Sequence, residues 1–518
     1  MTDVESLSEA LKAITVSTEL IEEELKPNLD TVLTALLEKR KDAAMEIARS
    51  GILPILVQSL QNKSSLSCQV ALVVAEMARE GAVREQCIEA GLVKVLVPHL
   101  NSNNQEMLLN TGRAIGRICF DNTYQQDQLV QSGVIPRLVS IMKEYPNNDP
   151  LVNVCLLALC NLADMESARE ALAELDVAEV LTNQLKRAPD SERRHVILEI
   201  LGSLGESDTL KLQFAECGVP EALSEMIQHL QGHSDPHDLC SIKIASNLMV
   251  SLLLGDESMQ KCFAEGSGIV YQNILSWLQS SNTQLQLAGA LAIANFARND
   301  SNCVKMLDLG VAFPILTLLE QHVDEGDVSV QHAGLSALRN LAIPEEAALK
   351  LGKDAVLLAR VLEWCEAKDH AGVKGEASRL LAALIRHSRS PEIVCAVARA
   401  DGVQHLISMA TSEHVIMQNE ALVALAIASA IDIVSMRDPL KEAELVPTLK
   451  SILDDPTGAA EVKFSALGLI CTLANSSVMR EELDSVNMKE SLSRLTDHSS
   501  GKLASQARSI LAILSDSS

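Results

Sequence analysis

The chain has 518 residues, of which 47% are hydrophobic and only 2% aromatic. This composition favours helices packed through Leu, Ala, Ile and Val over an aromatic-rich β fold. The formal net charge of −26 argues against a nucleic-acid ligand, whose phosphates require Lys and Arg, and against unaided docking on anionic lipid. The same charge favours a basic partner.

The twelve cysteines are spread singly and form no CxxC motif, which favours a reducing compartment and gives no sign of a disulfide framework. The N-terminal "MTDVESLSEALKAI" is acidic and amphipathic, unlike a signal or transit peptide. The longest apolar run, Ala421–Ile431, is too short to span a bilayer and predicts a buried helix. We therefore expect a cytosolic protein that does not span a membrane.

A short phrase recurs along the chain: a small residue, Gly, apolar residues and often Pro, followed by an apolar helix. Its copies begin with "SGILPILVQSL", "AGLVKVLVPHL" and "SGVIPRLVSIM" and continue with "CGVPEALSEMI", "LGVAFPILTLL" and "DGVQHLISMA". Gly51, Gly91 and Gly133 are 40 and 42 residues apart, and Glu444 takes the Gly position in a degenerate copy. The glycines of the second half are Gly268, Gly310 and Gly352 at steps of 42, and then Gly402 after 50.

Each period also holds a second phrase, a long apolar helix such as "CLLALCNLADMES" or "LSALRNLAIP". Gly would end one helix and allow a sharp reversal, Pro would open the next, and each long helix would bury its apolar stripe against its neighbours. A period near 42 with these phrases resembles the armadillo repeat. The expected fold is therefore all-α, a right-handed armadillo-repeat superhelical solenoid of about eleven repeats including atypical caps.

The predicted organisation is one solenoid over residues 1–518. It would comprise an N-terminal cap at 1–50, repeats over 51–485 with insertions near 229–240 and 363–375, and a C-terminal cap at 486–518.

The stretch Thr283–Asp300, "TQLQLAGALAIANFARND", predicts a single helix of about five turns. Leu287, Leu291, Ala294 and Ala297 would form its inward stripe. Asn295 and Asn299 would then face the same way, one turn apart. Two carboxamides in a helix interior indicate a groove that hydrogen-bonds a partner, although each Asn could instead tie down a neighbouring turn.

Aligned copies place Asn161, Asn295 and Asn340 at one equivalent groove position, flanked by His332, Arg339, Arg298 and Asp300. Acids also gather near the ends of the long helices, and together with the net charge they predict an acidic groove for a basic segment. The acids chosen for that groove are Glu199, Glu206, Asp256, Glu257 and Asp300.

No nucleotide-binding, metalloprotease or serine-hydrolase motif is present, so we expect neither an enzyme nor a cofactor. The best metal candidate, "QHLQGHSDPHDLC", contains His229, His233 and His237, but Gly232 and Pro236 break the helix between them. A solvated loop is the favoured interpretation, and no metal site is expected. An enzyme hidden in the insertions is the remote alternative.

Several longer phrases closely resemble the SmgGDS family, the armadillo-repeat GDP-dissociation stimulators of small GTPases. They are "LLLGDESMQK", "QLQLAGALAIANFARND", "VQHAGLSALRNLAIP", "EWCEAKDHAGV", "LLAALIRHS" and "ATSEHVIMQNEALVALA". The likeness is strongest between Leu252 and Ala426. Longer members of the family carry a further repeat after "ALRNLAIP" and another near Asp149.

The resemblance implies a non-hydrolytic exchange factor and chaperone for Rho- and Ras/Rap-type GTPases with basic, prenylated C-terminal tails. It implies a monomer located in the cytosol, with the nucleus as an additional option. The family's Asn pair in "ANFARN", which lies on the GTPase-binding surface, maps to Asn295 and Asn299, and we expect Asn340, Arg298, His332 and Arg339 beside it.

An importin-α-like adaptor that binds basic peptides is the alternative. That adaptor stacks Lys side chains on repeated groove tryptophans, and here the only tryptophans are Trp277 and Trp364.

Overall fold

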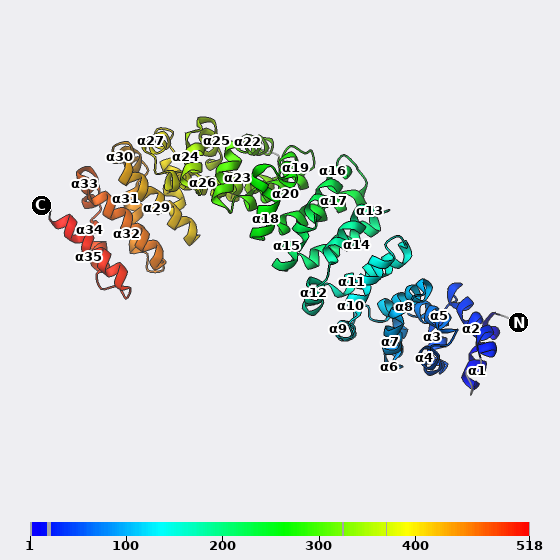
Figure 1. The fold of residues 1–518 in the computed structure, drawn as a ribbon. Helices are drawn as coiled ribbons and strands as arrows, with labels where there is room; N and C mark the ends of the chain where they lie inside the picture. Colours follow the sequence, from blue (N-terminus) through cyan, green and yellow to red (C-terminus); the bar gives the residue numbers. More distant parts are fainter. Residues whose placement is uncertain (1–2, 18–21, 324–325, 369, 517–518) are drawn as a thin grey trace. The chain divides into compact units, whose positions relative to one another are not determined.

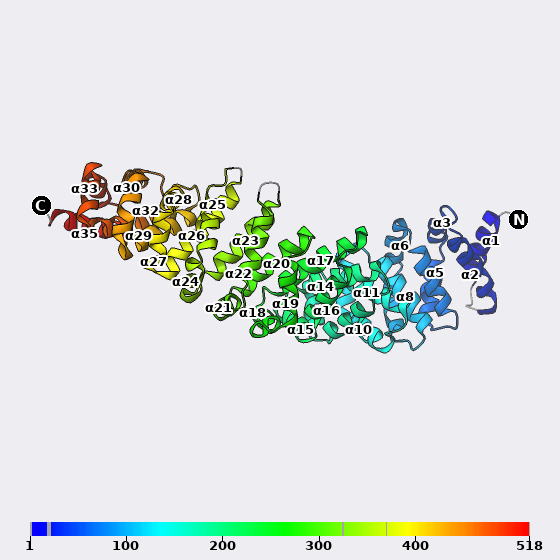
Figure 2. The same cartoon turned by 90° about the horizontal axis from the view of Figure 1, so that it is seen from above.

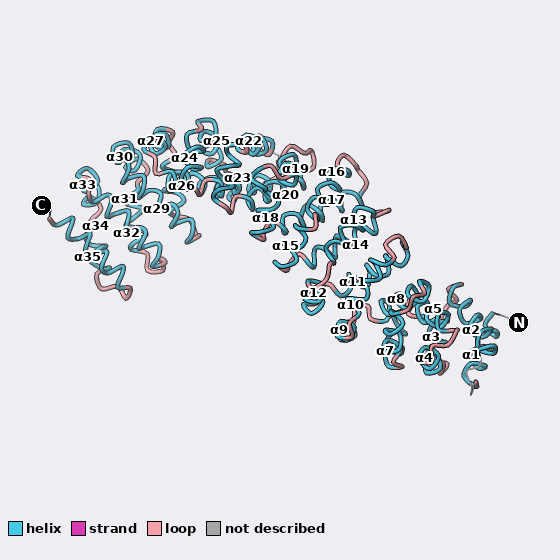
Figure 3. The backbone as a smooth tube through the Cα atoms, viewed as in Figure 1, coloured by secondary structure: helices cyan, strands magenta, loops and turns pink. Residues whose placement is uncertain are grey.

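The computed structural model describes residues 3–17, 22–323, 326–368 and 370–516, and the regular elements in these ranges are all helical (Figures 1 and 3). They comprise 35 α-helices and three short 3₁₀ segments. The all-α prediction is confirmed. Residues 1–2, 18–21 and 517–518 of the predicted caps, and Asp369 of the second predicted insertion, lie outside the described ranges.

The chain divides into two compact units, Met1–Ser258 and Met259–Ser518. The predicted boundaries of a single solenoid with caps and insertions stay predictions.

The first unit begins with two helices, α1 (Asp3–Val16) and α2 (Glu22–Leu37), and continues in triplets of two shorter helices and one long helix. The triplets are α3 (Ala43–Arg49), α4 (Leu53–Gln61) and α5 (Ser67–Met77); α6 (Arg84–Glu89), α7 (Leu92–Leu96) with a 3₁₀ segment (Val97–Asn101), and α8 (Gln105–Ile118); α9 (Thr123–Gln131), α10 (Val134–Glu144) and α11 (Asp149–Leu162); α12 (Glu166–Ala173), α13 (Val177–Arg187) and α14 (Ser191–Leu204); and α15 (Asp208–Glu216), α16 (Val219–Leu230) and α17 (Pro236–Leu252). The long helices α5, α8, α11, α14 and α17 each contact the next.

The second unit follows the same plan, and α18 lies across the boundary. Its triplets are α18 (Asp256–Phe263), α19 (Ile269–Trp277) and α20 (Thr283–Phe296); α21 (Asp300–Asp308), α22 (Ala312–Gln321) and α23 (Val328–Leu341); α24 (Glu345–Lys353), α25 (Ala355–Cys365) and α26 (Ala371–Ser388); α27 (Pro391–Arg399), α28 (Val403–Ala410) and α29 (Val415–Ile431); α30 (Ile433–Glu442), α31 (Leu445–Asp454) and α32 (Ala460–Ala474); and α33 (Ser477–Ser485), α34 (Met488–Leu495) and α35 (Gly501–Ser515). Figure 1 shows α26, α29, α32 and α35 following one another within this unit, Figure 2 shows the same helices turned by 90°, and each contacts the next.

The triplets from α3 to α35 number eleven, which agrees with the repeat count expected from the sequence period. Each long helix buries apolar side chains against its neighbours because its stripe has no other apolar surface to cover it. Among the described residues no single helix is both long and apolar enough to cross a bilayer, and two bent pairs of consecutive helices meet that test by length and composition only.

The repeated glycines serve two different purposes. Gly51, Gly91, Gly133, Gly218 and Gly310 adopt left-handed backbone angles at helix junctions, as predicted, and Glu444 takes the same conformation with φ 54°. Gly352 was predicted to be such a junction, and this is wrong because it lies buried inside α24. A Cβ there would come within 2.4 Å of Ile393 Cδ1, so this glycine permits close helix packing.

The helix predicted over Thr283–Asp300 is also wrong at its end, because α20 stops at Phe296 and a new helix, α21, begins at Asp300. Its buried face differs as well. Leu291, expected in the inward stripe, is 39% exposed, whereas Ala288, Ala292 and Phe296, which lie outside that stripe, are buried. Ala is small enough to let a neighbouring helix approach this side closely.

Candidate partner-binding site

One of the recurring asparagines on the long helices ties two neighbouring repeats together. Asn340, near the end of α23, donates from Nδ2 to the carbonyl oxygen of Ala294 in α20 at 3.3 Å. Asn295 occupies the corresponding place near the end of α20 and is half-buried. Asn340 therefore has the structural role that the sequence left open for this position, which is to hold a neighbouring segment in place.

Asn299 does not share a helix with Asn295, because it is the N-cap of α21. Its side-chain oxygen accepts a hydrogen bond from the Asn302 backbone N–H at 3.1 Å, which satisfies one of the unpaired donors at the helix start. Asp300, exposed in the first turn of α21, suits the positive end of the helix dipole. The repeat pattern left Asn299 unexplained, and the cap explains it.

We predict that Asn299→Ala destabilises the protein by about 1 kcal/mol, because the N-cap bond is lost. Asn299→Asp should be nearly neutral, since Asp caps equally well. Urea denaturation followed by circular dichroism measures both variants. Equal stability of Asn299→Ala and the wild type would contradict the capping role.

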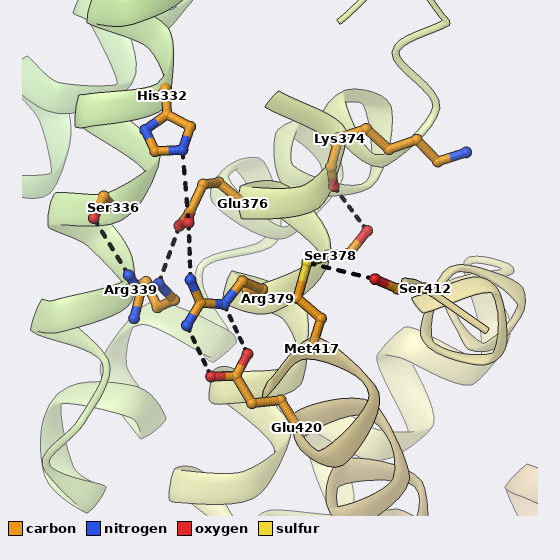
Figure 4. Close-up of polar contacts among 10 residues, drawn as sticks. All are labelled: His332, Ser336, Arg339, Lys374, Glu376, Ser378, Arg379, Ser412, Met417 and Glu420. Carbon is orange, nitrogen blue, oxygen red and sulfur yellow. Dashed lines mark hydrogen bonds and ion pairs between the residues drawn. The ribbon is translucent and has the colours of Figure 1, made fainter. Parts of the chain in front are cut away.

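His332 and Arg339, predicted to flank the asparagines, converge on one buried carboxylate (Figure 4). Arg339 Nε donates to Glu376 Oε2 at 3.0 Å, and His332 Nε2 lies 3.7 Å from Glu376 Oε1. The side chain of Glu376 is only 8% exposed. The carboxylate therefore joins α23 to α26.

The network continues from α26 to α29. Arg379 Nη1 donates to Glu376 Oε1 at 3.0 Å, and its Nε and Nη2 donate to the two oxygens of Glu420 at 2.8 and 2.9 Å. This bidentate geometry is the strong form of an Arg–carboxylate pair. We call Arg339, Glu376, Arg379 and Glu420 the ionic ladder, and it links three successive long helices.

Two opposing effects act on the pKa of the Glu420 carboxyl group. Burial alone would raise the pKa of its carboxyl group, but hydrogen bonds and charge from Arg379, with Arg339 and Arg386, bring that pKa below its ordinary value of 4.5. A carboxyl group with a lowered folded pKa stabilises the protein above its unfolded pKa, and this contribution disappears as the pH falls through the folded pKa.

We therefore predict that Glu420→Gln loses stability at neutral pH and also loses part of the acid sensitivity. Below pH 4.5 the wild type and the variant should converge as Glu420 becomes protonated in both states. Thermal melting at a series of pH values is the measurement. A constant difference across the acid range would show that the charge of Glu420 has no part in the ladder.

The five acids predicted to form one groove are distributed between the units. In the first unit, Glu199 Oε1 lies 3.0 Å from His195 Nε2, and Glu206 Oε2 lies 2.9 Å from Arg169 Nη1. Asp256 and Glu257 are exposed in the first turn of α18, and Asp300 belongs to the second unit. Arg298 is exposed beside Asp300.

The alternative sites receive no geometric support. Trp277 and Trp364 are 2% and 5% exposed and belong to the core, so they cannot stack the Lys side chains of an adaptor's cargo. In the loop considered as the best metal candidate, Asp235 caps α17 and Asp238 pairs with Arg194. Within the described ranges no group of three or more His, Cys, Asp or Glu is arranged to hold a metal ion.

Glu376, Arg379 and Glu420 were missed by the sequence analysis, although a signal existed. Arg339, Arg379 and Glu420 recur about one period apart on successive long helices, and Glu376 lies one turn before Arg379. Charges of opposite sign on adjacent repeats could have indicated a ladder.

A family model of the armadillo/β-catenin-like repeat matches residues 122–164. Rap1 GTPase-GDP dissociation stimulator 1-B of Xenopus laevis is 39% identical over 97% of this chain and 98% of its own length, and its relative 1-A is 38% identical with the same coverage. The GTPase-GDP dissociation stimulator vimar of Drosophila melanogaster is 24% identical over 84% of this chain and 87% of its own.

The alignment with the 1-B protein runs over 596 positions, 78 more than this chain has residues. At least that many positions, nearly two periods of 42, have no counterpart here.

Solved structures of low sequence identity support the fold and carry no information about function. An engineered protein gives a TM-score of 0.66 at 22% identity, over 82% of this chain and 98% of that one. A structure from work on the cadherin–β-catenin interaction gives 0.61 at 16% identity, over 98% of this chain and 90% of that one. The armadillo-repeat fold is therefore confirmed.

Proposed function

The chain belongs to the SmgGDS family of armadillo-repeat GTPase-GDP dissociation stimulators, and on this basis we propose that it accelerates GDP release from small GTPases of the Ras/Rap and Rho families. The observation that carries this proposal is the 39% identity to a Rap1 GTPase-GDP dissociation stimulator over nearly the full length of both chains.

Such a factor acts by binding and performs no chemistry on the nucleotide. It must bind the nucleotide-free GTPase more tightly than the GDP-bound form, since a ligand shifts an equilibrium only by its differential affinity. Every 1.4 kcal/mol of that difference weakens GDP binding about tenfold. Neither a cofactor nor a nucleophile is required.

We place GTPase binding on the long helices α20 and α23 and on the connection after α20, with Asn295, Asn340, Arg298, His332 and Arg339 as contact residues. Asn299 joins them through the NH₂ of its side chain, because its oxygen is committed to the cap. The ionic ladder supports this choice, because it holds Arg339 and its neighbours in place before a partner arrives. Pre-ordered side chains lose less entropy on binding.

We further propose that basic, prenylated C-terminal tails are bound by acids of the first unit, Glu199, Glu206, Asp256 and Glu257, and that Asp300 contributes a separate acidic contact in the second unit. We also propose that the protein chaperones these GTPases as a cytosolic monomer. The net charge of −26 supports a basic partner and an association that slows with salt. The missing positions relative to the Xenopus stimulators bear on which tails are preferred, since repeat number sets the length of the binding surface.

The direct test measures release of fluorescent GDP from Rap1- and Rho-type GTPases, with and without a prenylated tail. We expect acceleration that decreases between low and physiological salt. GTPases with the basic tail removed are the matched control and should respond less. Absence of acceleration throughout the panel would refute the proposed function.

A further inference from the structure

A pocket of about 630 Å³ lies in the first unit, on the surface shared by the long helices α8 and α11. This volume is within the range typical of ligand pockets, about 300–1,000 Å³. Its base is apolar and includes Phe120 and Leu157, which are 52% and 50% exposed, together with Val154 and Ala158. Large apolar side chains left so exposed in a concave place are typical of binding sites.

Three arginines surround this apolar base. Arg117 donates from Nη1 to Glu76 Oε1 at 3.3 Å, and the guanidinium carbon of Arg84 lies 5.3 Å above the centre of the Phe120 ring. Arg113 is half-buried and makes no hydrogen bond or ion pair within the described part of the chain. We call Arg84, Arg113, Arg117, Phe120 and Leu157 the arginine pocket.

A second polar group in the pocket also lacks a partner. Asn161 lines it from α11, is half-buried, and makes no hydrogen bond among the described residues. Asn340, which the repeat aligns with Asn161, uses its carboxamide to bind a neighbouring helix. In the first unit the corresponding carboxamide is thus available to a ligand.

The charge of the pocket lining is opposite to that of the whole chain. The lining includes three arginines and one acid, Asp149, which already pairs with Arg193 at 2.9 Å, whereas the chain as a whole has 43 Lys and Arg against 69 Asp and Glu. A half-buried guanidinium without a counterion favours a carboxylate, because the charge-assisted hydrogen bond replaces lost hydration.

We propose that the arginine pocket binds an acidic peptide segment that carries a large apolar side chain. The apolar side chain rests on Phe120 and Leu157, a neighbouring carboxylate pairs with Arg113, and the peptide backbone hydrogen-bonds Asn161. A concave apolar base favours a peptide with a protruding anchor over a flat anionic membrane. This site has the opposite charge preference from the acidic surface proposed for basic tails, and it acts independently of nucleotide release.

The structure offers a matched pair of substitutions. Gly116 in α8 lines the pocket, and a Cβ there meets no atom within 4 Å, so the backbone tolerates a side chain and Gly116→Leu introduces a large apolar group at the pocket wall. Gly202 holds the same place near the end of α14 and is equally open, so Gly202→Leu is the control. Arg113→Glu tests the charge separately.

The probe is a fluorescein-labelled peptide with a Phe-Leu pair flanked by Asp and Glu, titrated with the full chain and followed by fluorescence polarisation. We expect binding that falls about tenfold or more in Gly116→Leu and in Arg113→Glu and is unchanged in Gly202→Leu. Thermal melting of each variant verifies folding.

Three results would overturn the proposal. The first is equal binding of the same peptide with Lys in place of its acids, and the second is binding that survives both pocket substitutions. The third is an Arg113-dependent preference for phosphatidylserine vesicles or for a neutral prenylated peptide over the acidic peptide, which would assign the pocket to lipid.

Discussion

Replacing Glu376 with Gln should destabilise the protein by about 3 kcal/mol, because it leaves Arg339 without its anion and weakens the hold on Arg379. The substitution keeps the volume of the side chain, so the loss reports charge and hydrogen bonding and not packing. Removing one member of a buried ion pair costs more than the pair contributes, since the remaining charge stays partly desolvated. The midpoint of urea denaturation gives the change in the free energy of unfolding.

Glu461→Gln is the matched control, because Glu461 is an exposed acid on the long helix α32 and makes no ion pair within the described residues. Its substitution should change stability by less than about 0.5 kcal/mol. The double variant Glu376→Gln with Arg339→Gln should lose less than the sum of the two single variants, since both interrupt the same contact. Strict additivity would show that the ladder does not couple α23 to α26.

The fold could be predicted from the sequence because the repeat supplies many copies of the same local information. Gly at a junction, Pro at a helix start and an apolar long helix recur often enough that single exceptions do not matter. Gly352 is such an exception. It keeps the period of 42 while its physical purpose is close packing against Ile393, and only three-dimensional contacts distinguish the two uses.

The end of α20 could have been found in the sequence. Asn299 followed by Asp300 is a helix-start signal, an N-cap with an acid in the first turn, and it contradicts one continuous helix. The pattern of apolar residues hid the break, because α21 begins after only three intervening residues, Ala297–Asn299. The same pattern also predicted the wrong buried face. Most sides of α20 are covered, so apolar spacing does not single out one buried stripe, and Leu291 is one of the exposed positions.

The ionic ladder could be indicated by charges one period apart, but its pairing could not be predicted from the sequence. Arg339 and Glu376, and Arg379 and Glu420, are 37 and 41 residues apart, and which rotamers meet depends on the rotation of each long helix. Composition gave the net charge but not the pairing. Acids that composition assigns to an open groove, such as Glu206, therefore prove to be partnered within the first unit.

Phe296→Ala should be the most damaging single substitution in the second unit, with a loss of about 3–5 kcal/mol. Phe296 is fully buried, and its ring centre lies 5.6 Å from that of Phe263 and 5.4 Å from that of Tyr271, which are themselves 4.9 Å apart. The chain has only six Phe and three Tyr, so this cluster concentrates a third of them at one place. Neighbouring Leu and Ala side chains are too small to fill the cavity that truncation leaves.

Two variants separate cavity formation from other effects of the change. Phe464→Ala removes an equal ring that is 45% exposed on α32, and it should cost less than about 1 kcal/mol. Tyr271→Phe keeps the cluster filled and removes a buried hydroxyl group that has no hydrogen-bond partner within the described residues, so stability should be unchanged or higher. Chemical denaturation of all three proteins is the measurement. If Phe296→Ala cost no more than Phe464→Ala, the aromatic cluster would not be the packing centre of these first repeats of the second unit.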